Sequence, residues 1–437
     1  MTDTTATAPN VNFFDSETNH CPYPAYDQLR EEAPVWVDPR TGMFVLTRFE
    51  DIKTVLADPE LYTNEVGSAA GMTEKAMKPT DPAEIKRMEE EAAAEAEIRQ
   101  LYVDKGWVPG RNLDALDGDK HTQLRRMMSQ AFRPSRIKQL DPYVEELSGQ
   151  LFDSVLADGK CEWVSAFAVP LPLYTIGKQM GVSPEDMPKI KAWTDAWVQR
   201  LGLMQTMEER RWSAEQEIEA QHFFQAIFER LRKQPEDTVL SDLVNKEIPE
   251  WGRTLTDEEL HGEMMADIFV GGSETTTNAL SAGLLRLIQE PELWERLKSD
   301  PDTYLPTFIE EVVRTEGPVQ GLLRQAGRDT ELHGVPIPQG SVINLRFAAA
   351  NRDHRAFECP ADIDLERDAA KGHLAYGYGQ HFCLGAALAR RELYWGFKGL
   401  TERVESVRLD PDAGPLEYQP SYFLRGLKEL HVELTPR

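Results

Sequence analysis

The stretch Tyr376-Gly-Tyr-Gly-Gln-His-Phe-Cys-Leu-Gly385 decides how the rest of the chain is interpreted. Its glycines predict a turn, and the helix formers that start at Ala386 predict a helix directly after it. Cys383 therefore precedes a helix start, where unpaired backbone N–H groups favour a thiolate, a soft ligand for iron. Gly379 and Gly385 leave room for a flat partner. A buried structural cysteine is the alternative, but the aromatic-x-x-Gly-x-x-x-Cys-x-Gly spacing favours the ligand.

Composition and charge predict a soluble, cytoplasmic protein. The 437 residues include 48 Lys and Arg against 74 Asp and Glu, a net charge of −26, which repels nucleic acid and anionic membrane surfaces. The four cysteines show no C-x-x-C spacing and are expected to be reduced thiols. No signal peptide is visible, and the charged residues Asp267, Glu274 and Arg286 argue against a membrane span within 264–288. We expect neither nucleic acid nor a membrane as a partner.

Hydrophobic periodicity predicts a mainly helical protein with a minor β region. We expect a mobile tail over 1–12 and a single domain over 13–437. Apolar spacing predicts helices over 143–156, 187–203, 214–232, 260–289, 305–314 and 386–400. Alternating residues predict strands over 35–37, 44–47, 404–409 and 430–434, and a hairpin that joins Val335 to 342–345 through Pro338-Gln339-Gly340.

The segment 74–99 stands apart because it is dense in Glu, Ala and Lys. A solvated helix with mixed charge pairs explains this composition. A lid over a binding pocket is the alternative interpretation.

The sequence Gly271-Gly-Ser-Glu-Thr275 lies inside the longest apolar segment. Two glycines in mid-helix cost about 1 kcal/mol each relative to alanine, so they need a reason. Small residues here let a ligand lie against the backbone, and Thr275 can turn its hydroxyl to the carbonyl of Gly271. Glu274 adds a proton source in an apolar setting. Close helix–helix packing is the alternative.

Two further pairs place charged side chains on one helix face. Glu311 and Arg314 are three residues apart, and this spacing by itself is typical of a surface ion pair. His121 and Arg125 are four residues apart, and together they could hold a carboxylate through charge-assisted hydrogen bonds.

The sequence resembles the cytochrome P450 family over nearly the whole chain. The motifs follow each other along the chain in the order of that family: the His121 and Arg125 pair, the segment 271–275, the Glu311 and Arg314 pair, and the cysteine loop. This resemblance implies the cytochrome P450 fold, a single triangular domain that is mainly α with a minor β region. It also implies the cofactor heme b (iron protoporphyrin IX, the haem) with Cys383 as the proximal iron ligand. Tyr376 stands where the family usually has Phe.

The resemblance assigns roles to individual residues. Glu274 and Thr275 deliver protons to dioxygen, and Arg367 completes a buried cluster with Glu311 and Arg314 that fixes the cysteine loop. The residues that contact the haem or its propionates are Cys383, His121, Arg125, Arg324, His381, Gly271, Gly377 and Gly385.

The resemblance also implies the activity, a monooxygenase that inserts one oxygen atom from O2 into a lipophilic substrate such as a terpenoid, a steroid or an aromatic compound. Hydroxylation, dealkylation and C–C coupling begin with the same oxidant and stay open. The predicted substrate pocket contains Phe269, Val270, Val319, Leu322, Leu323, Tyr422 and Phe423. A peroxide-driven peroxygenase and a haem-thiolate binding protein without turnover are the alternatives.

The resemblance implies separate electron donors, a ferredoxin and a ferredoxin reductase, because no flavin or iron–sulfur segment is visible. We expect a monomer. A docking face for an acidic ferredoxin is predicted from basic residues near the cysteine, against the alternative of propionate ligands and solubility charges. These residues are Arg125, Arg126, Arg133, Arg136, Lys138, Arg390 and Arg391.

Overall fold

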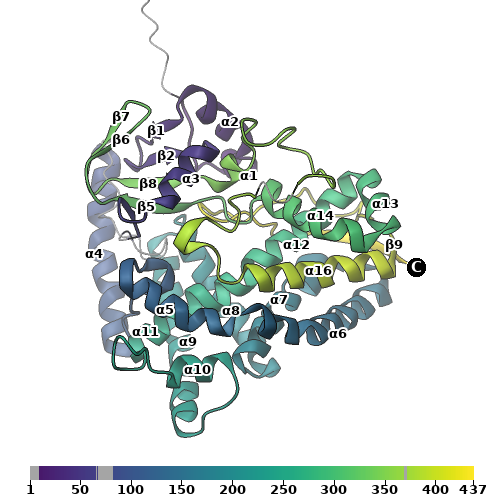
Figure 1. The fold of residues 1–437 in the computed structure, drawn as a ribbon, viewed down its shortest axis with the longest axis horizontal. Helices are drawn as coiled ribbons and strands as arrows, with labels where there is room; N and C mark the ends of the chain where they lie inside the picture. The colour runs from purple at the N-terminus through teal and green to yellow at the C-terminus, as the bar shows by residue number, and fades with distance from the viewer. Residues whose placement is uncertain (1–8, 65, 67–81, 369–371) are drawn as a thin grey trace, which may run out of the picture.

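Helices dominate the structure, a computed structural model that describes residues 9–64, 66, 82–368 and 372–437 (Figure 1). For residues 83, 84 and 87–94 it describes the backbone alone. The α-helices are α1 (Ser16–His20), α2 (Tyr23–Glu32), α3 (Phe49–Ala57), α4 (Pro82–Lys105), α5 (Gly118–Ala131), α6 (Pro134–Asp158), α7 (Pro170–Met180), α8 (Met187–Leu201), α9 (Met207–Lys233), α10 (Val239–Asn245), α11 (Asp257–Glu263), α12 (Gly271–Gln289), α13 (Pro291–Ser299), α14 (Pro301–Glu316), α15 (Phe347–Ala350) and α16 (Ala386–Arg403). Short 3-10 turns are η3 (Leu113–Ala115), η5 (Pro184–Asp186) and η8 (Gly379–His381), and π-helical segments are η4 (Val164–Ala168) and η6 (Met264–Val270).

The strands form three small sheets built from distant parts of the chain. They are β1 (Val35–Val37), β2 (Phe44–Leu46), β3 (Tyr62–Thr63), β4 (Lys160–Glu162), β5 (Leu322–Ala326), β6 (Thr330–Leu332), β7 (Val335–Ile337), β8 (Val342–Leu345), β9 (Val404–Leu409) and β10 (His431–Pro436). The sheet orders are β1-β2-β8-β5-β3, β4-β10-β9 and β6-β7. In the first, β8 runs parallel to β2 and antiparallel to β5, so it ties the N-terminal hairpin to the strand that carries Arg324.

The predicted hairpin between Val335 and 342–345 is wrong. β7 pairs with β6, while β8 belongs to the larger sheet. The turn that closes the β6–β7 hairpin is His333-Gly334, whose φ angles of 51° and 77° are both positive, as a two-residue type I′ turn requires. The hairpin over 35–37 and 44–46 and the strands β9 and β10 are confirmed.

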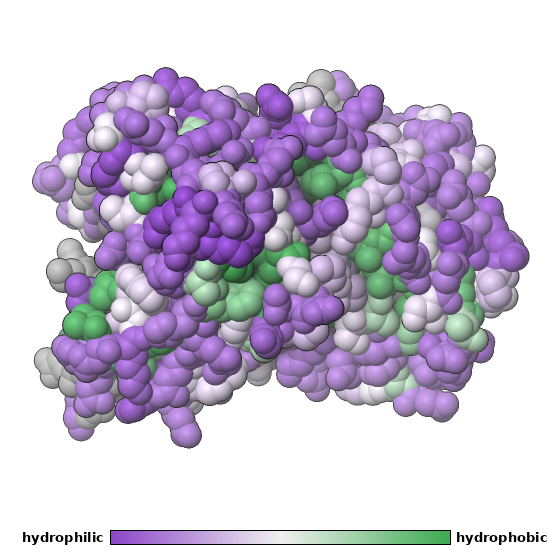
Figure 2. All heavy atoms as spheres, turned by 90° about the horizontal axis from the view of Figure 1, so that it is seen from below, coloured by the Kyte–Doolittle hydropathy of each residue, from purple (hydrophilic) through white to green (hydrophobic). Residues whose placement is uncertain are grey.

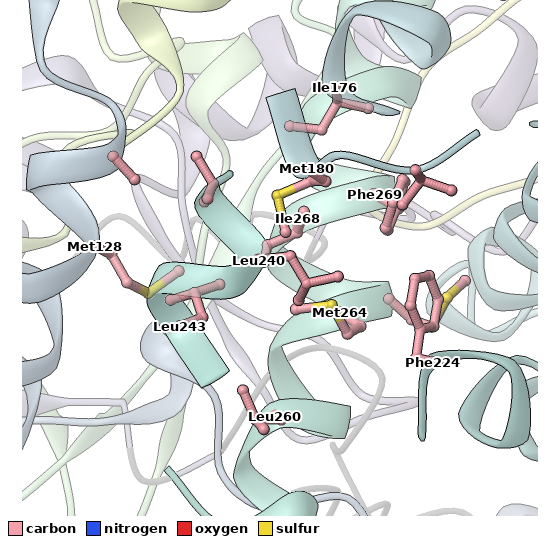
Figure 3. Packing of buried hydrophobic residues seen from close by; sticks show 14 of the residues in the cluster. Met128, Ile176, Met180, Phe224, Leu240, Leu243, Leu260, Met264, Ile268 and Phe269 are labelled. Carbon is pink, nitrogen blue, oxygen red and sulfur yellow. The ribbon is translucent and has the colours of Figure 1, made fainter. Parts of the chain in front are cut away.

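The predicted helix over 260–289 is a continuous helical rod that passes through the core but changes type along its length. It runs as α11, then as the π-helical η6, then as α12. Buried side chains from η6, including Met264, Ile268 and Phe269, pack against α7, α9 and α10 (Figure 3). The rod is therefore held on several sides, which fixes the residues of its remaining face.

The charged segment 74–99 is helical where the structure describes it, and residues 74–81 lie outside the described part. Helix α4 runs along one edge of the molecule in Figure 1. It packs on α9 through the buried Ile98 and Tyr102, and Arg210 pairs with Glu95 at 3.0 Å. Its C-terminal half is therefore anchored to the fold.

The mobile tail predicted over 1–12 lies partly outside the described residues. Residues 1–8 lie outside the described part, but Val11 is buried with Phe13, and Arg40 donates a hydrogen bond to its carbonyl at 3.1 Å. The chain is therefore packed against the fold by residue 11.

The face turned to the viewer in Figure 2 is mainly hydrophilic, with hydrophobic residues confined to small areas between hydrophilic ones. Within the described residues, no helix combines the length and the apolar character that crossing a membrane would need.

Candidate active site

Cys383 lies in the predicted turn between η8 and α16. Its backbone N–H donates to the carbonyl of Tyr376 at 2.8 Å, which closes the turn. Gly377 and Gly379 have φ angles of 71° and 72°, and a Cβ on Gly379 would lie 2.7 Å from the carbonyl oxygen of Leu56. These two positions therefore require glycine.

Gly385 serves a different purpose, because its φ of −82° suits any residue. A Cβ there would meet only the Cys383 sulfur, at 3.9 Å. The structure therefore does not itself require glycine at 385, and the predicted close approach of a flat partner stays a prediction.

The environment of the Cys383 thiol differs from the expectation that the helix start alone favours a thiolate. Burial raises the pKa of this thiol, although the N–H groups of Gly385 and Ala386 and the charges of Arg125 and Arg390 act to lower it. The side chain is nevertheless accessible to solvent. A metal ion deprotonates a coordinating thiol outright, so the donors around the sulfur suit a thiolate that binds a metal.

A set of polar contacts that the sequence did not predict, between Glu310 of α14, Arg390 of α16 and His373, holds the cysteine loop on the side of α14; we call it the polar clamp. Arg390 donates to Glu310 at 2.7 and 2.8 Å, and His373 lies 3.2 Å from the same carboxylate. The guanidinium of Arg390 also lies 4.4 Å from the ring centroid of Tyr376. Glu310 thereby connects residues before and after Cys383. In the sequence, only the position of Glu310 next to Glu311 could have indicated that it has a structural role.

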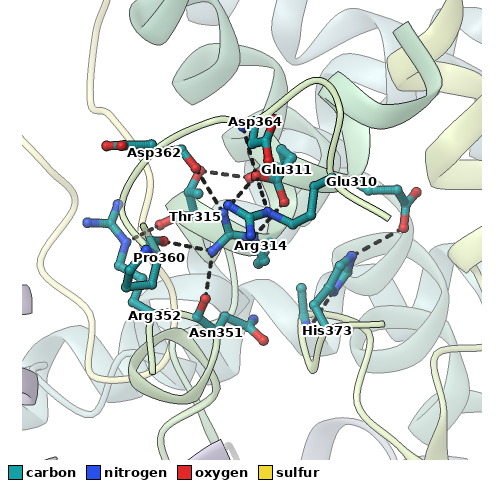
Figure 4. Close-up of polar contacts among 12 residues, drawn as sticks. Glu310, Glu311, Arg314, Thr315, Asn351, Arg352, Pro360, Asp362, Asp364 and His373 are labelled. Carbon is teal, nitrogen blue, oxygen red and sulfur yellow. Dashed lines mark hydrogen bonds and ion pairs between the residues drawn. The ribbon is translucent and has the colours of Figure 1, made fainter. Parts of the chain in front are cut away.

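Glu311 and Arg314 of the predicted cluster are buried and in contact (Figure 4). Arg367, the third member, is partly buried and also contacts Glu311. Arg314 donates to both oxygens of Glu311, at 2.7 and 2.8 Å, and Arg367 donates to Glu311 at 2.9 Å. The remaining donors of Arg314 bind the carbonyls of Asn351, Pro360 and Asp362. The side chain of Asn351 accepts from the N–H of Leu374, so the cluster reaches the segment that leads into the cysteine loop.

The four predicted propionate contacts lie close together. The rings of His121 and His381 are 4.1 Å apart, and Arg125 donates to the carbonyl of Phe382. Arg324 is buried and acts electrostatically on both imidazoles. Asp117, which the sequence did not predict, contacts His381 at 3.4 Å.

Two of these groups have unmet polar capacity. Both ring nitrogens of His121 are buried and have no hydrogen-bond partner among the described residues. Burial lowers the pKa of His121 to about 4, and burial lowers the pKa of Arg324 to about 10. The only hydrogen bond recorded for the Arg324 side chain among described residues goes to the carbonyl of Leu323, at 2.6 Å. A buried cation of this kind suits a carboxylate ligand.

The glycine pair in α12 has two separate explanations. Thr275 donates to the carbonyl of Gly271 at 3.1 Å, as predicted, and Gly271 is exposed. Gly272 instead packs on α7, where a Cβ would lie 3.1 Å from the side chain of Ile176. The predicted ligand contact thus remains open for Gly271, while helix packing explains Gly272.

Glu274 is largely buried beside a cationic side chain. Its Oε2 lies 3.9 Å from the Nζ of Lys191, which also pairs with Asp195. Burial raises the pKa of Glu274, Lys191 opposes this shift and Asp195 adds to it. A carboxyl group in this setting can hold a proton close to Thr275.

The predicted apolar pocket divides into two groups. Leu322 is exposed and Val319 is partly buried, so both can contact a ligand. The other five side chains are buried among the hydrophobic clusters, and their place in a substrate pocket stays a prediction: Phe269, Val270, Leu323, Tyr422 and Phe423. Phe269 packs on Phe224 with ring centroids 5.3 Å apart, because its face of the rod points to α9.

Comparison with known proteins agrees with this geometry. A family model for cytochrome P450 matches residues 192–403. The steroid C26-monooxygenase of Mycobacterium tuberculosis is 30% identical over 434 residues, which cover 98% of both chains. The polyketide biosynthesis cytochrome P450 PksS of Bacillus subtilis is 31% identical over 96% of this chain and 97% of its own. The solved structure of cytochrome P450 CREJ with (4-ethylphenyl) dihydrogen phosphate has a TM-score of 0.85 and 28% identity, covering 98% of this chain and 100% of that one. The chain belongs to the cytochrome P450 family, whose members are haem-thiolate monooxygenases.

The residues of this chain fit the haem of that family. Cys383 is an exposed free cysteine in a glycine-rich turn, and its thiolate is a suitable ligand for iron. His121 and Arg324 are buried polar groups with unmet capacity and suit carboxylate groups such as the two propionates of haem. The fit therefore rests on the chemistry of the donors as well as on the family.

Proposed function

We propose that Cys383 is the iron ligand of this enzyme and that its substrate is lipophilic, such as a terpenoid, a steroid or an aromatic compound. The observation that carries the proposal is the exposed, free Cys383 in a loop clamped by Glu310 and Arg390. A steroid and a polyketide pathway in the names of two relatives support a lipophilic substrate. When bound, the haem supplies the activation of O2 that inserts one oxygen atom into the substrate.

The protein's own part is to hold the reactants and to move protons. His121, Arg125, Arg324 and His381 hold the propionates by charge-assisted hydrogen bonds. Thr275 presents its hydroxyl at the exposed turn of α12, and Glu274 carries a proton to it from the side of Lys191.

The test is the absorption spectrum of the reduced holoenzyme under carbon monoxide. We expect the red-shifted Soret band of a thiolate-ligated ferrous carbonyl in the wild type and its loss in Cys383→Ser. Cys21→Ser, which changes another exposed free thiol, should keep the band. An unchanged band in Cys383→Ser would overturn the assignment.

We also propose that a ferredoxin, reduced by its reductase, docks near the cysteine loop. Four of the seven predicted basic residues already have acidic partners: Arg126 pairs with Glu250, Arg136 with Asp242, Arg390 with Glu310 and Arg391 with Asp141. Arg133 and Lys138 are exposed, and no acidic side chain in the described residues lies within ion-pair distance of them. These two residues are therefore the best candidates for docking an acidic partner.

Charge reversal tests this docking face. Arg133→Glu with Lys138→Glu should slow reduction by a plant-type ferredoxin about tenfold at low salt, with a smaller difference at high salt. Arg408→Glu, at an exposed position on β9, should leave the rate unchanged. Equal rates in all three proteins would remove the docking face.

The remaining predictions stay proposals. They are a single domain from residue 13 onward, a monomeric state and a cytoplasmic location. The four cysteines are free in the structure, which supports a reducing compartment.

A further inference from the structure

A small cavity lies where the N-terminal segment meets the turn 421–425 near the end of the chain. Its walls include Phe13, Asn19 of α1 and Tyr26 of α2, together with the side chains of Arg346 and Arg425. The centre of a water-sized sphere can move within about 10 Å³ of this space, which is room for one water molecule or one monatomic ion. We call it the arginine cavity.

Arg346, which lies between β8 and α15, is a buried cation in the wall of the arginine cavity. It is 1% exposed, and its guanidinium lies 4.1 Å from the ring centroids of both Phe13 and Tyr422. Its Nη1 donates to the carbonyl of Tyr422 at 2.7 Å. Its Nε and Nη2 are buried and have no partner of good hydrogen-bond geometry among the described residues. Two of the three guanidinium nitrogens therefore have unmet donor capacity.

The phenols beside this guanidinium do not balance its charge. Burial raises the pKa of Tyr26 and Tyr422, and the adjacent Arg346 acts to lower both. Tyr26 already donates to Oε1 of Gln320 at 2.7 Å, and the phenol oxygen of Tyr422 accepts from Nδ2 of Asn344 at 2.8 Å. Both phenols are uncharged at neutral pH, so they offer dipoles to the guanidinium but no negative charge.

Arg425 adds a second positive charge to the arginine cavity. Its Nη2 donates to the carbonyl of His20 at 3.2 Å, and its guanidinium lies 3.6 Å from the ring centroid of Tyr418. Its Nε is buried without a hydrogen-bond partner in the part of the chain that the structure describes. Guanidinium N–H groups without partners are the donors that bind an anion through charge-assisted hydrogen bonds.

The protein supplies no direct counter-charge, although the chain has 74 Asp and Glu against 48 Lys and Arg. Within the described residues, no acidic side chain lines the cavity or lies within ion-pair distance of Arg346 or Arg425. Asp38 and Glu316 act on these two arginines only electrostatically. Glu316 pairs with two other arginines, at 3.3 and 3.4 Å. Because a buried cation without a counter-charge is costly, the cavity favours an anion.

The arginine cavity lies between segments that are far apart in the sequence. Asn19 and Ser421 are 402 positions apart, and the Nδ2 of Asn19 donates to the carbonyl of Ser421 at 2.8 Å. Thr18 and Asn19 are partly exposed, so a small ion can exchange with solvent at this edge. An ion held by both arginines would therefore connect the N-terminal segment, the start of α15 and the turn 421–425.

We propose that Arg346 and Arg425 bind one monatomic anion such as chloride, which stabilises the contact between the two ends of the chain. The volume of the cavity is too small for phosphate, sulfate or a carboxylate ligand. Haem and substrate take no part in this site, so it is independent of the proposed function.

Urea unfolding of the holoenzyme in sodium chloride and in sodium gluconate at equal ionic strength tests the site. Gluconate provides the same charge and screening but is too large for the cavity. Chloride that binds the folded state alone should lower the unfolding equilibrium constant of the wild type about tenfold when its concentration is about ten times its Kd. Equal unfolding of the wild type in the two salts, at every chloride concentration, would overturn the proposal.

Two variants locate the ion. Arg346→Met keeps a long apolar side chain between the two rings and should abolish the chloride dependence, while general effects of the two salts on unfolding remain. Arg48→Met is the control, because Arg48 is a partly buried arginine outside the cavity, whose Nε donates to the carbonyl of Arg30 at 3.0 Å. It should keep the chloride dependence. Dependence that survives Arg346→Met, or that disappears in Arg48→Met, would overturn the assigned site.

Bromide tests the wild type directly and keeps the proposal falsifiable if Arg346→Met does not fold. Bromide replaces chloride at halide sites and is identified by its anomalous X-ray scattering. Crystals of the holoenzyme soaked in sodium bromide should show an anomalous peak between Arg346 and Arg425. A water molecule without anomalous signal at this place would overturn the anion site.

Discussion

The two sides of the proposed active site differ in whether their buried polar groups have hydrogen-bond partners within the protein. Behind the cysteine loop, Glu310 and Glu311 are each held by arginine hydrogen bonds of 2.7 to 2.9 Å. On the opposite side, both ring nitrogens of His121 are buried without hydrogen-bond partners among the described residues. The protein fixes the cysteine loop through its own contacts and leaves polar capacity at His121, one of the residues proposed to hold the haem. Substitutions behind the loop should therefore change stability, and those in the pocket should change activity.

The largest effect is expected from Arg314→Leu, behind the loop. The variant leaves Glu311 buried with one of its two arginine partners, so the free energy of unfolding should fall by about 3–5 kcal/mol. Urea denaturation of the holoenzyme measures it. Arg408→Leu is the matched control, because Arg408 is 73% exposed and its pair with Glu433 should contribute about 1 kcal/mol or less. Equal losses in the two variants would contradict the comparison.

On the pocket side, Glu274→Gln and Thr275→Val should lower product formation about 100-fold while the free energy of unfolding stays within about 1 kcal/mol of the wild type. Each variant removes one member of the proton path. The measurement is product and hydrogen peroxide formed per electron pair, with a substrate chosen by spectral screening. Thr277→Val is the control, since the hydroxyl of Thr277 donates to Ala168 at 3.0 Å instead. A full rate in both test variants would exclude this path.

The smallest effect is a pH-dependent one at Glu310. Burial acts to raise the pKa of Glu310, but hydrogen bonds from Arg390 and His373 prevail and lower it from 4.5 to about 2. The unfolded chain therefore binds more protons between pH 4.5 and 2, and this contribution to stability, complete above pH 4.5, is lost as the pH falls. Glu310→Gln should be less stable by about 2 kcal/mol at pH 7.

Urea midpoints at pH 7, 5, 4 and 3 follow the difference between Glu310→Gln and the wild type. The gap should narrow below pH 4.5, whereas Glu258→Gln, at an exposed position, should follow the wild type throughout. A gap that stays constant down to pH 3 would show that the clamp does not depend on the ionised carboxylate.

The parts of the site that could be predicted from sequence depend on local spacing. The hydrogen bond from Thr275 to Gly271 and the pair of Glu311 with Arg314 join residues three or four positions apart, and the turn at Cys383 is closed by Tyr376, seven positions away. Backbone geometry then fixes which groups can meet. The mainly helical fold followed from long periodic segments in the same way.

The parts that were missed depend on packing between distant segments. Hydrophobic residue type identified Phe269 and Tyr422 as apolar but could not show that both side chains are fully buried by distant segments. Asp267 was noticed only as a charge that argues against a membrane span, because its neighbours Asp114 and Asn112 come from a loop more than 150 positions away. The sequence indicated that the helix start favours a Cys383 thiolate, but it could not show that burial raises the pKa of this thiol more than the helix start lowers it.

Because η6 is π-helical, the number of residues in this segment determines how the residues before it are rotated relative to Thr275. A π-helix contains one more residue in each hydrogen-bonded turn than an α-helix. Deleting one residue within 264–270 would restore α-helical bonding and rotate the residues before the deletion by about 100° relative to Thr275. When the deleted residue lies within 268–270, Ala266 takes the position of Asp267 on the rod. A change in chain length alone would then remove the two hydrogen bonds that Asp267 accepts from Asn112 and Asp114.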